Sequence, residues 1–271
     1  GKEVQQLLVD PLVGSIYATD TNNFSLAMMP QLAALATGRS VLLTARKQMK
    51  SAPKTTTPIF ETPRSGLATL TDSLHESIIA LGGHITTSTT VQSISRTDNG
   101  YTVDISGSSS NSLHADCIIV ASPARASAKL LQTLSEDASK LMGSAEHSSV
   151  VMATIKTVET DLPKLAGLSG YLVPKPDQDR VTATSFGSNK WAHWKPSDGS
   201  MILRVSLGRD GAPTHDLLHE WDDERIVRQV IDEVSRHTQT SITPDVFRVT
   251  RWPESFPQYR PRPELLSHPP F

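Results

Sequence analysis

The sequence predicts an α+β protein in which an α/β segment is interrupted by a separate sheet lobe. Three observations carry this prediction. Apolar residues recur at helical spacing between residues 65 and 83, a continuous apolar run at 117–121 leads directly into a second helical pattern, and four strand-like runs separated by turns follow residue 148. With 271 residues, of which 37% are hydrophobic, the chain has enough apolar side chains to form a packed core.

The first fifty residues are predicted to be mostly helical, because turn signals alternate with apolar residues at helical spacing. Asp20, Thr21 and Asn22 are candidates to cap a helix that ends at Gly38. The segment that follows, SAPKTTTP at 51–58, is polar and bounded by prolines, which is typical of a surface loop.

The next segment is predicted to be an amphipathic helix followed by a β-hairpin. One helical stripe ends at Gly82 and Gly83 and contains Leu67, Leu70, Leu74, Ile78 and Leu81. Two runs rich in β-forming residues, 84–97 and 100–106, are joined at Asp98, Asn99 and Gly100, and an Asn-Gly pair is a strong hairpin signal. A serine-rich turn at 106–112 leads out of the second run.

The run LHADCIIVASP at 113–123 is predicted to be a buried parallel strand that feeds a helix over 124–134, like one edge of a nucleotide-binding sheet. Cys117 lies inside this apolar run, so a buried structural thiol is expected there. Later strands are predicted at 148–158, 170–174, 180–186 and 201–208, in an antiparallel or mixed sheet of their own.

A helix is predicted over 221–238, with acids in its first turn and an apolar stripe of Ile226, Val230, Ile231 and Val234. A final strand over 245–253 precedes a proline-rich tail.

Composition and motifs exclude several classes of function. A net charge of −2 gives no field that would attract nucleic acid, and no apolar stretch reaches the roughly 18–20 residues of a transmembrane segment. The single cysteine fits a reducing compartment, so a cytoplasmic protein is expected. The chain contains no G-x-S-x-G elbow, no G-x-G-x-x-G turn and no Walker A motif.

Two clusters allow competing interpretations. His215 and His219 have the i, i+4 spacing of a metal-binding pair, but the intervening residues lack a catalytic glutamate, so an exposed helix start is favoured and no metal is expected. The basic residues at 46, 47 and 50 suit an anionic substrate, although a solvated helix end is the commoner meaning of such a cluster. On residues alone, the activity stays undetermined.

Across residues 4–259, the sequence resembles the protoporphyrinogen and coproporphyrinogen oxidase family of the flavin-containing amine oxidase superfamily. The resemblance rests on pieces that recur in order. They are GSIYATDTNNFSLAMMPQL, SGLATLTDSL, TTVQSI, DCIIVASPARASAKLL, SSVVMATI, SGYLVP, SNKW, LRVSLGR and RWPESFPQY. The last of these, together with SGYLVP and SNKW, selects the porphyrinogen branch over monoamine oxidases and carotenoid desaturases.

The resemblance implies an α/β FAD-domain segment, a mixed-sheet substrate lobe and a helical lobe. Residues 1–60 correspond to the helical lobe over the active site, 61–147 to part of the FAD-binding domain, and 148–240 to the substrate-binding sheet with its helix. Residues 241–271 correspond to a return segment to the FAD domain plus the proline-rich tail. The family's N-terminal G-x-G-x-x-G segment and its C-terminal flavin-contacting segment have no counterpart in this sequence, so a fragment is expected.

Site residues follow from the same resemblance. Val91, Ala121, Pro123 and Trp252 match positions that contact FAD, although Val91 also suits a core strand and Trp252 also suits packing. Gly170 and Leu172 match the substrate-pocket strand, where an apolar wall suits a flat macrocycle. Arg204 is a candidate partner for a propionate, or else faces solvent.

The implied reaction is oxidation of a porphyrinogen, either coproporphyrinogen III or protoporphyrinogen IX, in heme biosynthesis, with FAD as hydride acceptor and molecular oxygen as oxidant. Because the cofactor carries the chemistry, no catalytic side chain is singled out. An inactive fragment that keeps only porphyrin or partner binding, and another flavin amine oxidase, are the alternatives. The oligomeric state, a homo-oligomer included, is left open.

Overall fold

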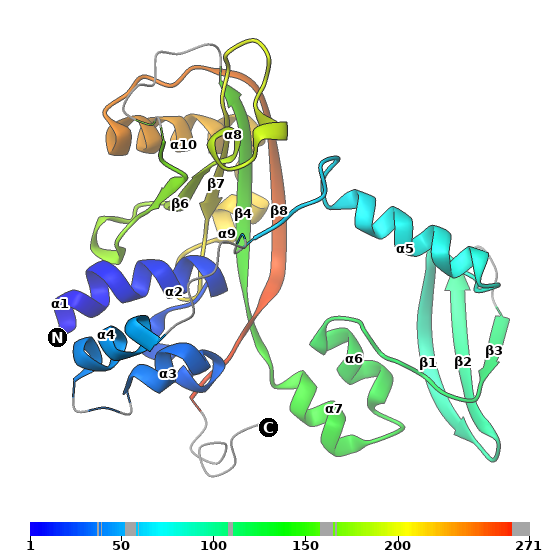
Figure 1. Ribbon diagram of the computed structural model, residues 1–271. Helices are drawn as coiled ribbons and strands as arrows, with labels where there is room; N and C mark the ends of the chain where they lie inside the picture. The colour runs from blue at the N-terminus through cyan, green and yellow to red at the C-terminus, as the bar shows by residue number, and fades with distance from the viewer. Residues whose placement is uncertain are drawn as a thin grey trace. The chain divides into compact units, whose positions relative to one another are not determined.

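The computed structural model describes residues 1–36, 38, 40–51, 58, 60–107, 111–157, 165 and 167–261. The chain divides into two compact units (Figure 1). One, here called the sheet unit, comprises Gly1–Thr55 and Glu146–Phe271, and the other, the hairpin unit, comprises Thr56–Ala145.

Short helices open the sheet unit. They are α1 (Lys2–Val4), a π-helical turn (Gln5–Val9), α2 (Asp10–Tyr17), two 3₁₀ turns (Thr21–Asn23 and Leu26–Met28), α3 (Pro30–Ala36) and α4 (Val41–Ser51). The mostly helical character predicted for this region is confirmed.

The helix predicted to start at Asp20 is wrong in its extent. Asp20 does act as a cap, since its Oδ1 accepts a hydrogen bond of 3.0 Å from Asn22 N, but the capped element is only one 3₁₀ turn. Pro30 explains the break, because the residue before a proline is disfavoured from the helical region, and Met29 accordingly has φ −126° and ψ 71°. Helix α3 then starts at Pro30 itself, where a missing N–H is tolerated.

A five-stranded antiparallel sheet forms the centre of the sheet unit, in the order β5-β6-β7-β4-β8. Its strands are β4 (Glu146–Thr157), β5 (Gly170–Leu172), β6 (Val181–Phe186), β7 (Ile202–Leu207) and β8 (Pro244–Gln258). The four predicted strands after residue 148 are confirmed. The final strand is longer than predicted because it pairs with β4 along nearly the whole of that strand, from Thr157↔Pro244 to Glu146↔Gln258.

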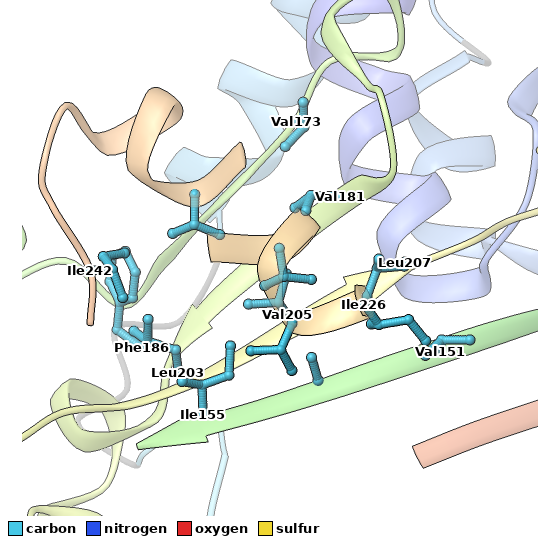
Figure 2. Packing of buried hydrophobic residues seen from close by; sticks show 14 of the residues in the cluster. Val151, Ile155, Val173, Val181, Phe186, Leu203, Val205, Leu207, Ile226 and Ile242 are labelled. Carbon is cyan, nitrogen blue, oxygen red and sulfur yellow. The ribbon is translucent and has the colours of Figure 1, made fainter. Parts of the chain in front are cut away.

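Helix α10 (Asp223–Thr238) packs against one face of this sheet and closes the core. Asp222 caps the helix by accepting a 2.7 Å hydrogen bond from Arg225 N. Figure 2 shows Leu207 of β7 and Val151 of β4 beside Ile226 of the helix, and all three side chains are fully buried. Each such side chain contributes about 1.5–3 kcal/mol relative to leaving it in water. The predicted stripe is confirmed, and Val227 joins it.

Three shorter elements connect the strands: α8 (Gly187–Lys190), a 3₁₀ turn (Ala192–Trp194) and α9 (His215–His219). A further 3₁₀ turn, Lys175–Asp177, lies between β5 and β6.

The hairpin unit contains α5 (Ala68–Ala80), a three-stranded antiparallel sheet of β1 (Thr89–Thr97), β2 (Gly100–Gly107) and β3 (Asn111–Ala115), and then α6 (Ala124–Leu131) and α7 (Glu136–Gly143). The predicted hairpin is confirmed, with Thr97 opposite Gly100. Gly100 has φ +134°, and a Cβ there would lie 2.5 Å from Ala115 O, so only glycine fits.

Two sequence predictions for the hairpin unit are wrong. Residues 117–120 form no strand, Ile119 is 89% exposed, and Cys117 is exposed rather than a buried thiol. A parallel strand needs a hydrogen-bonding neighbour, and no described strand pairs with this segment, because β3 ends at Ala115 and pairs only with β2. The predicted helix itself is confirmed as α5, with Leu70, Leu74 and Ile78 inside it and Leu67 and Leu81 as its cap residues, and all five side chains are exposed.

Among the described residues, the helices are too short or too polar to cross a bilayer.

Candidate functional site: the open face of the sheet

The face of the five-stranded sheet that α10 leaves uncovered carries a row of polar side chains. Because side chains alternate along a strand, and Leu203 and Val205 are buried against α10, Arg204 between them lies on the opposite, open face. In register with it on the neighbouring strands are Ser185 on one side and Thr154, then Arg248, on the other. Four strands therefore place two arginines in one row.

A first hollow, with a volume of about 420 Å³, lies between α2 and this open face. Helix α2 contributes Leu12, Ser15 and Ile16, the strands contribute Gly170, Leu172 and Arg204, and helix α8 contributes Lys190, among others. No aspartate or glutamate occurs among the described residues that line it. The hollow thus combines an apolar wall with two cations, which suits an apolar ligand that carries an anionic group.

Ser15 adds an orphaned polar group to this wall. Its Oγ is buried, and no hydrogen-bond partner for it occurs within the described part of the chain. Because a buried hydroxyl without a partner costs free energy, a ligand group that reaches it would recover that cost.

A buried ion pair holds α2 in place. Arg209 Nη1 lies 2.7 Å from Asp10 Oδ2, Arg209 Nη2 lies 2.8 Å from Asp10 Oδ1, and the two side chains are only 4% and 1% exposed. Burial by itself would raise the pKa of Asp10, but hydrogen bonds from Arg209 and Thr21 outweigh it and lower that pKa. The guanidinium also requires Gly14, where a Cβ would come within 3.0 Å of it.

A second hollow, of about 840 Å³, lies further along the open face and shares Arg204 with the first. Its lining includes the aromatic side chains of Trp194 and Trp252 and the basic side chains of His193, Lys195 and Arg248. The guanidinium carbon of Arg204 lies 6.0 Å from the ring centre of Trp194, within range of a cation–π contact. No carboxylate occurs among the described lining residues of this hollow either.

The cations of this row differ in ion pairing from a lysine on the same sheet. Lys156, two residues after Thr154 on β4, forms ion pairs with Asp198 at 2.8 Å and Asp245 at 3.1 Å. Of the ion pairs formed by the described residues, none includes Lys190, Arg204 or Arg248. Lys190, Arg204 and Arg248 thus line the hollows without a carboxylate partner among the described residues.

The residues predicted as substrate ligands come together in this structure. Gly170, Leu172 and Arg204 line the first hollow. Gly170 has φ +146°, and a Cβ there would lie 2.3 Å from Thr184 O, so glycine lets β5 approach β6 closely. Their binding role stays a prediction.

The residues predicted to contact the cofactor lie in both units. Trp252, 51% exposed, lines the second hollow of the sheet unit. In the hairpin unit, Val91 is 37% exposed at a bulge in β1, Ala121 lies in the loop that precedes α6, and Pro123 is the N-cap residue of that helix. Their cofactor role also stays a prediction.

Three residues that line the hollows were not predicted from the sequence: Lys190, Arg248 and Trp194. Lys190 lies within the SNKW piece, so the family resemblance contained a signal for it. Arg248 alternates with apolar neighbours as Arg204 does, which indicates a surface-facing side chain but not the strand opposite it.

The remaining sequence candidates lie away from these hollows. His215 and His219 are exposed on α9 with ring centres 4.9 Å apart, and no group of three potential metal ligands occurs within the described ranges. Arg46, Lys47 and Lys50 are exposed on α4 and line neither hollow.

Comparison with known proteins identifies a family whose sequence model matches this chain. The family model for flavin containing amine oxidoreductases matches residues 1–270. Coproporphyrinogen III oxidase of Bacillus subtilis (strain 168) is 26% identical over 268 residues, covering 96% of this chain and 54% of the relative. Coproporphyrinogen III oxidase of Mycobacterium leprae (strain TN) is 27% identical over 268 residues, covering 96% of this chain and 55% of the relative.

Solved structures agree on the fold. A crystal structure described as "Putative protoporphyrinogen oxidase" from Exiguobacterium sp. 255-15 superposes with a TM-score of 0.76 at 23% identity, over 94% of this chain and 53% of that one. Cyclohexylamine oxidase from Brevibacterium oxydans IH-35A has a TM-score of 0.60 at 16% identity, over 93% of this chain and 51% of that one. The chain spans about half the length of the curated relatives it matches.

Proposed function

Because this chain belongs to the flavin-containing amine oxidoreductase family, we propose that it supplies the substrate-binding face of an oxygen-dependent porphyrinogen oxidase. The observation that carries the proposal is the first hollow, where Gly170, Leu172 and Arg204 line one cavity together with Lys190. The names of the curated relatives support the same substrate class.

The chemistry of the hollow favours a porphyrinogen over an amine. A porphyrinogen has a largely apolar tetrapyrrole body with propionate side chains that are anionic at neutral pH, whereas an amine substrate is cationic. Lys190 and Arg204 would attract carboxylates and repel an ammonium group, and no described lining residue carries a negative charge. The alternative of another flavin amine oxidase is therefore disfavoured.

Two residues, one in each unit, are proposed to contact different parts of the cofactor, FAD. Trp252 offers a half-exposed indole face that suits a flavin ring. The family resemblance implies that the backbone of Val91 contacts adenine. The sequence holds no G-x-G-x-x-G turn for the diphosphate. When bound, FAD would accept a hydride from the macrocycle and pass the electrons on to molecular oxygen.

The chain's own side chains then bind, orient and shield. Leu12, Ile16 and Leu172 provide an apolar wall that displaces water from the ring. Arg204 and Lys190 hold a propionate and so fix the orientation of the macrocycle. Positioning of this kind needs no acid–base side chain among the lining residues.

Oxidation of coproporphyrinogen III tests this proposal. The chain is mixed with FAD, and porphyrin fluorescence is followed in air and without oxygen, with protoporphyrinogen IX and cyclohexylamine as comparison substrates. Oxygen-dependent porphyrin formation that is weakened in Arg204→Gln supports the proposal. Flavin reduction by the amine alone contradicts it. Porphyrin binding without oxidation would instead favour the alternative of a fragment that retains only binding.

A further inference from the structure

The second hollow contains Arg248, Trp194 and Lys195, which the proposed function does not use. Arg248 on β8 lies opposite Thr154 on β4, and Thr154 lies opposite Arg204 on β7. Two strand spacings therefore separate the arginines, so their Cα atoms lie roughly 10 Å apart. Both side chains line this hollow, whereas only Arg204 also lines the first.

These two arginines face one hollow without a protein counter-charge. Within the described part of the chain neither forms an ion pair, while Lys156 on the same sheet has two carboxylate partners. Like charges that share a concave surface repel each other, and an anionic ligand relieves that repulsion. Guanidinium groups bind a carboxylate through two parallel hydrogen bonds, which makes arginine suited to this task.

Aromatic side chains stand beside the arginines. Trp194 and Trp252 both line the hollow, and Trp252 is half exposed. Indole faces bind flat apolar rings, and Arg204 already lies over Trp194. The hollow therefore suits one edge of a flat ring that carries a carboxylate.

We infer that the second hollow is a subsite for a second carboxylate of the same substrate, and that Arg248 binds it. The inference rests on the proposed function, because the first hollow must hold the first carboxylate. Arg204 lies between the two subsites. A tetrapyrrole with more than one propionate, such as coproporphyrin III, would engage both hollows.

Titrations with three ligands test the subsite: coproporphyrin III, its tetramethyl ester and inorganic pyrophosphate. Arg248→Gln is expected to weaken binding of coproporphyrin III about tenfold while leaving the uncharged ester unchanged. Arg248 is exposed, so the substitution should not affect folding. Arg248→Lys should retain part of the affinity. Arg228→Gln, on the exposed side of α10, is the matched control and should bind like the unaltered chain.

The outcomes separate this inference from the proposed function. Unchanged binding of coproporphyrin III by Arg248→Gln overturns the subsite alone, and so does an equal loss for the ester. A loss confined to pyrophosphate identifies a phosphate site and also overturns it. Absence of porphyrin binding by the unaltered chain overturns the proposed function and the subsite together.

Discussion

The buried ion pair that anchors α2 offers a sharp test of how the wall of the first hollow is held. Arg209→Met removes the guanidinium that makes two hydrogen bonds to Asp10 and one of 2.5 Å to Thr19 O. Asp10, whose side chain is 1% exposed, keeps only its hydrogen bonds from Thr21, at 3.2 Å and 2.7 Å. A buried carboxylate left without its cation typically costs 3–5 kcal/mol, and the remaining Thr21 bonds argue for about 3 kcal/mol.

Urea unfolding followed by circular dichroism measures this loss. At pH 7, the free energy of unfolding should fall by about 3 kcal/mol, a large share of the usual 5–15 kcal/mol. Arg236→Met is the matched control, because the pair of Arg236 with Asp232 is exposed, at 3.5 Å, and should change stability by less than about 0.5 kcal/mol.

The pH dependence of the free energy of unfolding provides a second test of this prediction. In the unaltered chain, the lowered pKa of Asp10 provides stability that is present above pH 3.8 and is lost as the pH falls through the folded-state pKa. In Arg209→Met, burial without the cation raises that pKa, so protonation relieves the buried charge. The difference in the free energy of unfolding between the unaltered chain and Arg209→Met should therefore become smaller between pH 7 and pH 4. A difference below about 1 kcal/mol at pH 7, or one that does not become smaller at pH 4, would refute this reasoning.

Two further predictions concern the same unit. Burial raises the pKa of Tyr171 to about 12, so an absorbance titration of the folded chain should show a late-ionising tyrosine that is missing in Tyr171→Phe. The associated stability is intact below pH 10 and is lost as the pH rises towards 12; ionisation of every tyrosine near pH 10 would contradict this. Gly14→Ala should lower the unfolding free energy by about 1–3 kcal/mol, because the added methyl meets the Arg209 guanidinium at 3.0 Å. Urea unfolding with no measurable loss would show that the guanidinium can move aside.

Local signals account for what could be predicted about the fold. The hairpin at Gly100 depends on turn chemistry within a few residues, and helix α10 depends on periodicity along one segment. The hairpin and the helix could both be predicted because the interactions that decide them lie within the turn itself or along one face of one helix. The long pairing of β8 with β4 joins segments about a hundred residues apart, so its extent was not readable.

Non-local partners account for what failed. An apolar run such as the one around Cys117 favours a strand, but a strand forms only where a neighbour pairs with it, and the described chain offers none. The stripe of α5 likewise identified an apolar face without identifying what, if anything, covers it. For the site, the alternation of Arg204 and Arg248 with apolar neighbours indicates only that each faces away from the core, whereas their shared row depends on strand register, which the sequence does not contain.

Quenching of tryptophan fluorescence by coproporphyrin III tests the central claim most directly. Two of the four tryptophans, Trp194 and Trp252, line the second hollow of the open sheet face, so bound porphyrin should quench emission saturably. Arg204→Gln should weaken the quenching, and excess cyclohexylamine should leave it unchanged. No saturable quenching, or displacement of the porphyrin by the amine, would contradict the assignment of this face to a carboxylated tetrapyrrole.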